Sequence, residues 1–124
     1  MSIHTLNSEQ DLESILEAHD LVLIDFWAPW CPPCKEFHPI FEKVAEQHPD
    51  VAFCRVNTEE VKSLQQGFEV HHIPTLIVIR ERIMLTSQAG YLPEEGLEDL
   101  ITKALRLDLN ALRKEMDDSD KGGK

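Results

Sequence analysis

Two cysteines separated by two prolines stand between a strand-like run and an amphipathic helix. The run from Leu21 to Trp27 is almost continuously apolar and has the length of a strand covered on both faces. After Cys34, apolar residues recur every three or four positions as far as Ala45, which is helical spacing. A helix therefore begins at the cysteines. Cys31 stands at its positive N-terminal end, where a thiolate is favoured.

The residues between the cysteines restrict how such a thiolate can be stabilised. If Cys31 is the N-cap, Pro32 and Pro33 occupy the first two helical positions and offer no N–H group. The amide of Cys34 is then the nearest backbone donor to Cys31. A pair of this kind can exchange disulfides, with one thiol attacking and the other resolving the mixed disulfide. The alternatives are two reduced cysteines that merely pack, or a metal site.

The rest of the chain predicts a mixed sheet flanked by helices. Asn7 or Ser8 can cap a helix predicted over 8–19, and Asp11 stands three residues after Ser8 as in a capping box. A second strand over 51–56 follows the cysteine helix, and this order implies a parallel crossover. The remaining predicted elements are a polar helix over 59–66 ended by Gly67, strands over 75–79 and 83–87 forming an edge hairpin, and a last helix opened by Pro93. Between the hairpin strands, Arg80-Glu81-Arg82 lacks the Gly or Asn of a tight turn, so its geometry stays open.

Composition limits the domain count, the partners and the compartment. The 124 residues, 42% of them hydrophobic, suffice for one core and not for two domains. A formal charge of −11 disfavours nucleic acid and anionic membrane surfaces, and no apolar segment is long enough to span a bilayer. The opening residues do not resemble a secretion signal, and three cysteines do not make a disulfide scaffold, so we expect a cytoplasmic protein. The third cysteine, Cys54, is predicted to be a small buried hydrophobe.

Several motifs together resemble the thioredoxin family. They are the run Asp-Phe-Trp-Ala-Pro-Trp-Cys over 25–31, the second cysteine Cys34, and Ile73-Pro74-Thr75 downstream, within a resemblance that covers roughly residues 3 to 106. The resemblance implies an α/β thioredoxin fold, a mixed central sheet flanked by helices, with an extended C-terminal helix. We expect a thioredoxin domain over 1–106, a C-terminal helical extension over 107–116 and a disordered tail over 117–124.

What the resemblance implies about function is reduction of protein disulfides by dithiol exchange. It implies no cofactor, because the redox-active disulfide of Cys31 and Cys34 carries the electrons. The implied partners are disulfide-containing client proteins and a thioredoxin reductase, with the chain itself a monomer. The Pro32-Pro33 pair departs from the Gly-Pro usual in thioredoxins and is similar to the motif of tryparedoxins and nucleoredoxins, which leaves the electron donor open.

The resemblance also gives Asp25 a role. In thioredoxins the matching aspartate accepts a proton from the second cysteine, here Cys34. Burial among apolar neighbours would raise the pKa of Asp25 and suit it to that task. Arg55 stands where the family usually has a lysine near this acid. It either faces Asp25 or is a solvated arginine at a strand end.

Five further residues are expected around the dithiol. By resemblance, Pro74 is cis and faces the dithiol, and Ile73 offers its backbone to an extended substrate segment. Trp30, Ile73 and Gly90 match the flat apolar rim on which thioredoxins dock their partners, although Trp30 could instead be buried. Trp27 is expected to pack beneath the site rather than to touch substrate.

Two other functions remain as alternatives. The first is metal binding by Cys31 and Cys34 with one or two of three nearby histidines, His38, His71 and His72, although the pattern favours an ordinary turn or helix position for each of them. The second is a partner-binding or chaperone-like module. An apolar stripe continues past the family's usual end through Leu109, Leu112 and Met116, as either a longer last helix packed on its own domain or a docking face for a partner.

Overall fold

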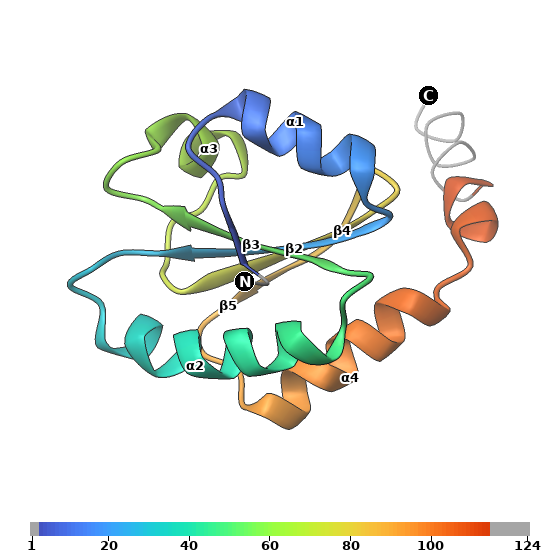
Figure 1. The fold of residues 1–124 in the computed structure, drawn as a ribbon. Helices are drawn as coiled ribbons and strands as arrows, with labels where there is room; N and C mark the ends of the chain where they lie inside the picture. Colours follow the sequence, from blue (N-terminus) through green and yellow to red (C-terminus); the bar gives the residue numbers. More distant parts are fainter. Residues whose placement is uncertain (1–2, 115–124) are drawn as a thin grey trace.

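One mixed sheet forms the centre of the molecule. The computed structural model describes residues 3–114 and places five strands in the order β1-β3-β2-β4-β5 (Figure 1). β1, β3 and β2 run parallel, whereas β4 is antiparallel to both β2 and β5. The strands are β1 (Ile3–Thr5), β2 (Leu21–Trp27), β3 (Ala52–Asn57), β4 (Thr75–Arg80) and β5 (Ile83–Ala89). The predicted mixed sheet, parallel crossover and edge hairpin are confirmed.

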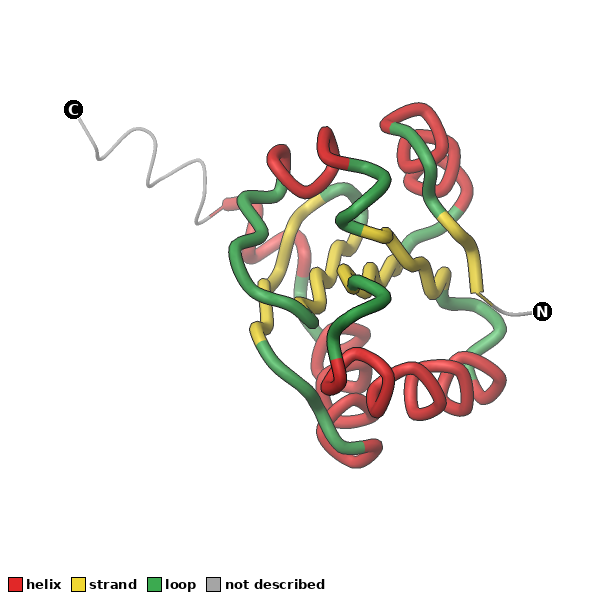
Figure 2. Tube along the Cα trace, turned by 90° about the vertical axis from the view of Figure 1, so that its left-hand side faces the viewer, coloured by secondary structure: helices red, strands yellow, loops and turns green. Residues whose placement is uncertain are grey.

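Helices cover both faces of this sheet. In Figure 1, α1 and α3 lie on one side of the strands and α2 and α4 on the other, and Figure 2 shows helices on both sides after a 90° turn. The helices are α1 (Glu9–Ala18), α2 (Pro32–Gln47), α3 (Lys62–Gly67) and α4 (Glu94–Arg106). None of the helices within residues 3–114 has the length and apolar content to span a bilayer.

The central strand β2 divides its side chains between the two helical layers. Val22, Ile24 and Phe26 pack in the core with α1 and α3, while Leu21 and Leu23 pack in the core with α2 and α4. Because side chains alternate along a strand, Asp25 faces the α2 layer. The Asp25 carboxylate therefore lies on the same side of the sheet as α2, the helix that begins at the cysteines.

Local signals set most helix boundaries, with one shift. The Ser8 hydroxyl accepts the N–H of Asp11 at 3.1 Å, and the Asp11 carboxylate in turn accepts the N–H of Asn7 at 2.9 Å, so α1 begins as the capping pattern predicted. α3 begins at Lys62, later than the predicted residue 59. The cause is a turn in which the Asn57 side chain accepts the N–H of Glu59 at 2.9 Å.

The β4–β5 turn uses two residues that are unusual for its conformation. Glu81 has φ 47° and Arg82 has φ 69°, the left-handed values of the two-residue turns that match strand twist. A non-glycine residue costs roughly 1–2 kcal/mol in this region. Contacts elsewhere offset that cost, because the Glu81 N–H donates to the Asp20 carbonyl at 2.8 Å and Arg82 pairs with Glu13. The tight hairpin thus forms without the expected glycine or asparagine.

Beyond α4 the chain is helical again, but as a separate segment. α4 ends at Arg106, and residues 109–114 form a further helical stretch whose first amides, those of Asn110 and Ala111, donate to the Asp108 side chain. Leu109 is buried and Leu112 is half-buried, so this part of the stripe packs on its own domain. Met116 and the predicted tail over 117–124 lie outside the described residues.

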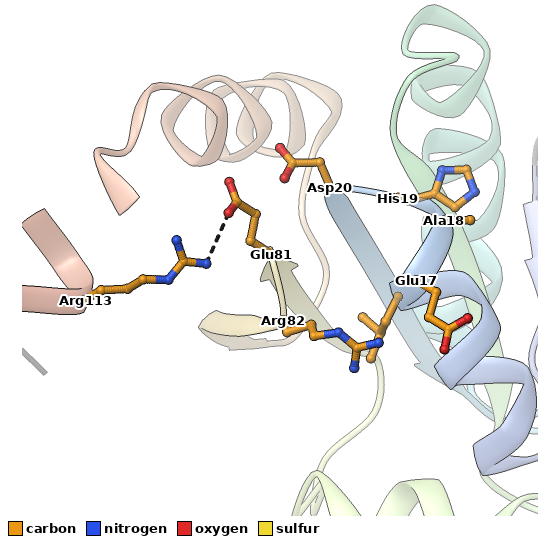
Figure 3. Close-up of a pocket in the computed structure, with 8 residues that line it drawn as sticks. Glu17, Ala18, His19, Asp20, Glu81, Arg82 and Arg113 are labelled. Carbon is orange, nitrogen blue, oxygen red and sulfur yellow. Dashed lines mark hydrogen bonds and ion pairs between the residues drawn. The ribbon is translucent and has the colours of Figure 1, made fainter. Parts of the chain in front are cut away.

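Arg80 fastens the end of α4 to the sheet. Its Nη1 atom lies 2.9 Å from the carbonyl oxygen of Ala104, 3.1 Å from that of Leu105 and 2.8 Å from that of Leu107. These carbonyls have no helical partner at a helix C-terminus, so a cation there satisfies them and complements the helix dipole. Nearby, Arg113 donates to Glu81 at 3.1 Å beside an open pocket of 390 Å³ (Figure 3). This pocket lies at the start of β2, the opposite end from the cysteines.

We expect Arg80→Ala to lower the free energy of unfolding by about 2 kcal/mol, because hydrogen bonds to a charged donor are worth roughly 1.5–3 kcal/mol. Urea unfolding followed by circular dichroism measures the change. Arg106→Ala removes a positive charge from the last turn of α4 and serves as the control, since its side chain is exposed. Equal losses in both variants would show that charge near the helix end, rather than carbonyl capping, is what matters.

Candidate active site

The two cysteines form a disulfide at the N-terminus of α2. Their Cα atoms are 5.3 Å apart. Cys31 is the N-cap, and its Sγ accepts the N–H of Cys34 at 3.3 Å, as expected with Pro32 and Pro33 at the first two helical positions. Cys31 is 3% exposed and Cys34 is fully buried. Cys31 is therefore the more exposed of the two cysteines, and a backbone N–H already points at its sulfur.

An apolar shelf borders the disulfide. Ala28 is buried with the two cysteines, and Trp27 and Ile73 pack against this cluster. Trp27 thus packs directly against the disulfide cluster. Trp30 is 64% exposed, so the alternative that it is buried is wrong. The exposed indole and the half-buried Ile73 leave an apolar surface beside Cys31.

The loop before β4 completes this border. The Ile73-Pro74 peptide bond is cis, as expected, and the Pro74 carbonyl accepts the N–H of Gly90 at 2.8 Å. Gly90 has φ +96°, and an added Cβ there would meet no atom within 4 Å. Within the chain, then, Gly90 is needed for its left-handed backbone rather than for lack of space.

Asp25 lies fully buried on β2, facing the α2 layer. Burial raises the pKa of its carboxyl to about 7, although the positive charge of Arg55 acts in the opposite direction. Arg55 Nε lies 3.6 Å from Asp25 Oδ2, so Arg55 faces the acid and is not a solvated strand-end residue. The guanidinium is also held by the His38 carbonyl at 3.0 Å and by Glu42 at 3.1 Å. Arg55 is thereby fixed beside Asp25 without a close hydrogen bond to it.

His38 is the second group beside this carboxylate. Its Nε2 atom lies 3.6 Å from Asp25 Oδ2, and its ring meets the Trp27 indole edge to face with centroids 4.9 Å apart. Burial lowers the pKa of His38. The sequence indicated His38 only as a metal ligand with Cys34 or as an ordinary helix residue. His38 follows Cys34 by four residues and so lies on the same face of α2, but its facing partner on the sheet is Asp25.

The remaining candidates do not join the site as ligands. Within residues 3–114, no group of three or more His, Cys, Asp or Glu side chains is arranged to hold a metal ion. His71 and His72 are exposed. The metal hypothesis therefore gains no support from the structure. Cys54 is buried in the opposite core layer, where burial raises the pKa of its thiol to about 12, as expected of a small buried hydrophobe.

Comparisons with known proteins agree on one family. The sequence profile described as Thioredoxin matches residues 2–103. A Streptomyces coelicolor protein named "Putative thioredoxin 2" is 43% identical over 107 residues, which are 86% of this chain and 80% of that protein. "Thioredoxin 1" of Synechococcus elongatus is 34% identical, over 75% of this chain and 88% of the relative. Among solved structures, a mutant thioredoxin from Halobacterium salinarum matches with a TM-score of 0.81 and 29% identity, over 86% of this chain and 94% of that one.

Proposed function

Because the chain belongs to the thioredoxin family and is a thiol-disulfide oxidoreductase, we propose that it reduces protein disulfides with Cys31 as nucleophile, Cys34 as resolving thiol and Asp25 as base. One observation carries this assignment of roles. Cys31 is the more exposed member of the pair and its sulfur accepts a backbone N–H at a helix N-terminus, while Cys34 is fully buried. That asymmetry separates the attacking thiol from the resolving one.

The reaction consists of two thiol-disulfide exchanges. The Cys31 thiolate attacks one sulfur of the client disulfide, which forms a mixed disulfide and releases the other client sulfur as a thiolate. The Cys34 thiol then loses its proton and attacks Cys31 Sγ. The second client thiolate leaves, and the Cys31–Cys34 disulfide remains. Two electrons have passed to the client, and a dithiol reductant must return them before the next cycle.

Asp25 is proposed to accept the Cys34 proton in the second exchange. Both groups are buried between β2 and α2, so bulk water does not serve as the base. A pKa of about 7 keeps a substantial fraction of Asp25 ionised at neutral pH while leaving the carboxylate basic enough to take a proton. The positive charge of Arg55 keeps that pKa from rising further.

The docking surface is proposed to be the apolar border around Cys31. Exposed Trp30 and the half-buried Ile73 would contact a client, and Ile73 would pair its backbone with an extended client segment. The cis Pro74 bond and the left-handed Gly90 hold this border in place through the 2.8 Å hydrogen bond between them. The clients are disulfide-containing proteins.

The partners and the compartment are proposals of the same kind. The chain would act as a monomer, and a thioredoxin reductase would reduce its Cys31–Cys34 disulfide after each cycle. It would work in the cytoplasm, since a free, buried Cys54 suits a compartment that keeps thiols reduced. Whether the Pro32-Pro33 pair changes the donor is a separate question that a panel of purified reductases can answer.

A reduction potential tests the direction of electron flow. The protein is equilibrated with defined ratios of reduced and oxidised glutathione, and its thiols are trapped with acid and counted. We expect a potential near about −270 mV, the value of a thioredoxin-type reductant. A potential near about −120 mV would make the protein an oxidant and would overturn the proposed direction. Acid trapping is chosen because it does not depend on how Trp30 fluoresces.

A further inference from the structure

We propose that His38 relays the proton of Asp25 to solvent after each turnover. This inference rests on the proposed function, since it concerns the proton that Asp25 takes from Cys34. Asp25 is fully buried, and it must lose that proton before it can act again. A neighbouring group therefore has to carry the proton out.

The contacts of Asp25 leave one group able to do so. Within residues 3–114, two cationic or titratable side chains lie within ion-pair distance of its Oδ2 atom, Arg55 and His38, each at 3.6 Å. An arginine cannot deprotonate in a protein, so Arg55 cannot pass a proton on. The Trp27 indole, which meets the His38 ring, is a donor only and is excluded for the same reason. An imidazole can accept a proton on one nitrogen and release another from the second.

The position of His38 bridges the interior and the surface. Its side chain is 22% exposed, against 0% for Asp25. Its Nε2 atom is itself buried and has no hydrogen-bond partner in the protein, as is true of both Asp25 oxygens. The exposed part of the side chain therefore belongs to its other atoms. One nitrogen faces the acid while another part of the same side chain reaches water.

The protonation chemistry of the pair agrees with this assignment. Burial and the positive charge of Arg55 lower the pKa of His38, while Glu42 raises it, so the net shift is downward. The imidazole is then neutral at rest and free to accept a proton, and its protonated form loses that proton readily to water. The steps balance: protonated Asp25 gives its proton to Nε2 of His38, which becomes an imidazolium, and a proton leaves from Nδ1 to buffer. A flip of the ring then turns the unprotonated nitrogen toward Asp25 for the next cycle. A small rotation of the His38 ring would bring the two atoms from 3.6 Å to hydrogen-bond distance.

The test is rescue of a His38 variant by a small external base. His38→Ala should slow steady-state disulfide reduction about 10-fold at neutral pH, less than the roughly 100-fold that a directly acting base contributes, and should leave the first release of the mixed disulfide unchanged. Added imidazole should restore the rate in proportion to its concentration, because it occupies the space beside Asp25 and takes the proton itself. His38→Gln fills that space without relaying a proton, so it should be slow and should not respond to imidazole. His71→Gln, at an exposed histidine, is the control that should behave as the parent chain does.

The outcomes separate the relay from the proposed function. A His38→Ala protein that keeps the parent rate at every pH, or that is slow but insensitive to imidazole, overturns the relay. In both cases Cys31→Ser would still be inactive and the reductase proposal would stand. If instead the parent chain fails to reduce a model protein disulfide, or Cys31→Ser retains that activity, the proposed function itself fails. Thermal unfolding of each variant shows whether a slow one is merely unfolded.

Discussion

Cys31→Ser should abolish disulfide reduction, lowering turnover of a model protein disulfide by roughly 1,000-fold or more. A serine hydroxyl at neutral pH is a far weaker nucleophile than a thiolate, and the Cys34 thiol cannot replace it because Cys34 is fully buried. The fold should survive, since the change replaces one small atom at a helix N-cap and serine is itself a good N-cap residue. A turnover assay with the reductant in excess measures the loss.

Cys34→Ser is the matched variant and should fail in a different way. Its Cys31 still attacks, but no second thiol resolves the product, so the protein should accumulate as a mixed disulfide with its client. Non-reducing electrophoresis would show a covalent complex that disappears when a thiol reductant is added. Cys31→Ser should not form this complex. If Cys31→Ser formed the complex and Cys34→Ser did not, the two roles would be reversed. If neither variant lost activity, the dithiol would not be the reacting pair.

Asp25→Asn should stabilise the oxidised protein, and more so as the pH rises. The pKa of Asp25 is raised from 3.8 to about 7, so the folded state holds a proton that the unfolded chain releases. The parent protein therefore loses stability as the pH rises from the pKa of Asp25 in the unfolded chain, 3.8, to its pKa in the folded protein, about 7. Above about pH 7 the loss levels off. A raised pKa of this size corresponds to a penalty on the order of 4 kcal/mol, which asparagine does not carry.

The measurement is urea unfolding of parent and variant at about pH 4 and about pH 8. The two proteins should differ far more at the higher pH, and Asp50→Asn, at an exposed aspartate, should show no such trend. An equal difference at both pH values would mean that Asp25 is not protonated in the folded state near neutrality. A base kept at a cost in stability fits a group retained for its chemistry rather than for the fold.

The sequence predicted the sheet and the dithiol because both rest on strong local patterns. β2 is nearly continuous in apolar residues, and the cysteine spacing next to it allows few folds. Ser8 and Asp11 mark the start of α1 through a hydrogen bond that depends only on neighbours. β1 was not predicted, because a three-residue edge strand carries too little apolar pattern to be distinguished from a loop.

The sequence indicated most residues of the site but not which of them contact one another. Asp25 and Arg55 could be named from the resemblance, yet whether Arg55 faced the acid depended on how β2 and β3 align, and these two residues prove to be register partners. His38 required more, since its contact with Asp25 joins a helix face to a strand face across the core. The hydrogen bonds of Arg80 to the carbonyls at the end of α4, here called the Arg80 clamp, could not be predicted from the sequence either. The C-terminal ends of α4 and β4 meet only in the folded state.

The Arg80 clamp and the Arg113 contact also determine how the protein can be attached to other materials. They hold residues 104–113 at the end of the sheet where β2 begins, while Cys31 follows the far end of the same strand (Figure 1). A fluorophore or a solid support attached within this segment would lie at the opposite end of β2 from the dithiol. An N-terminal fusion would instead enter through β1, an edge strand that pairs directly with β3.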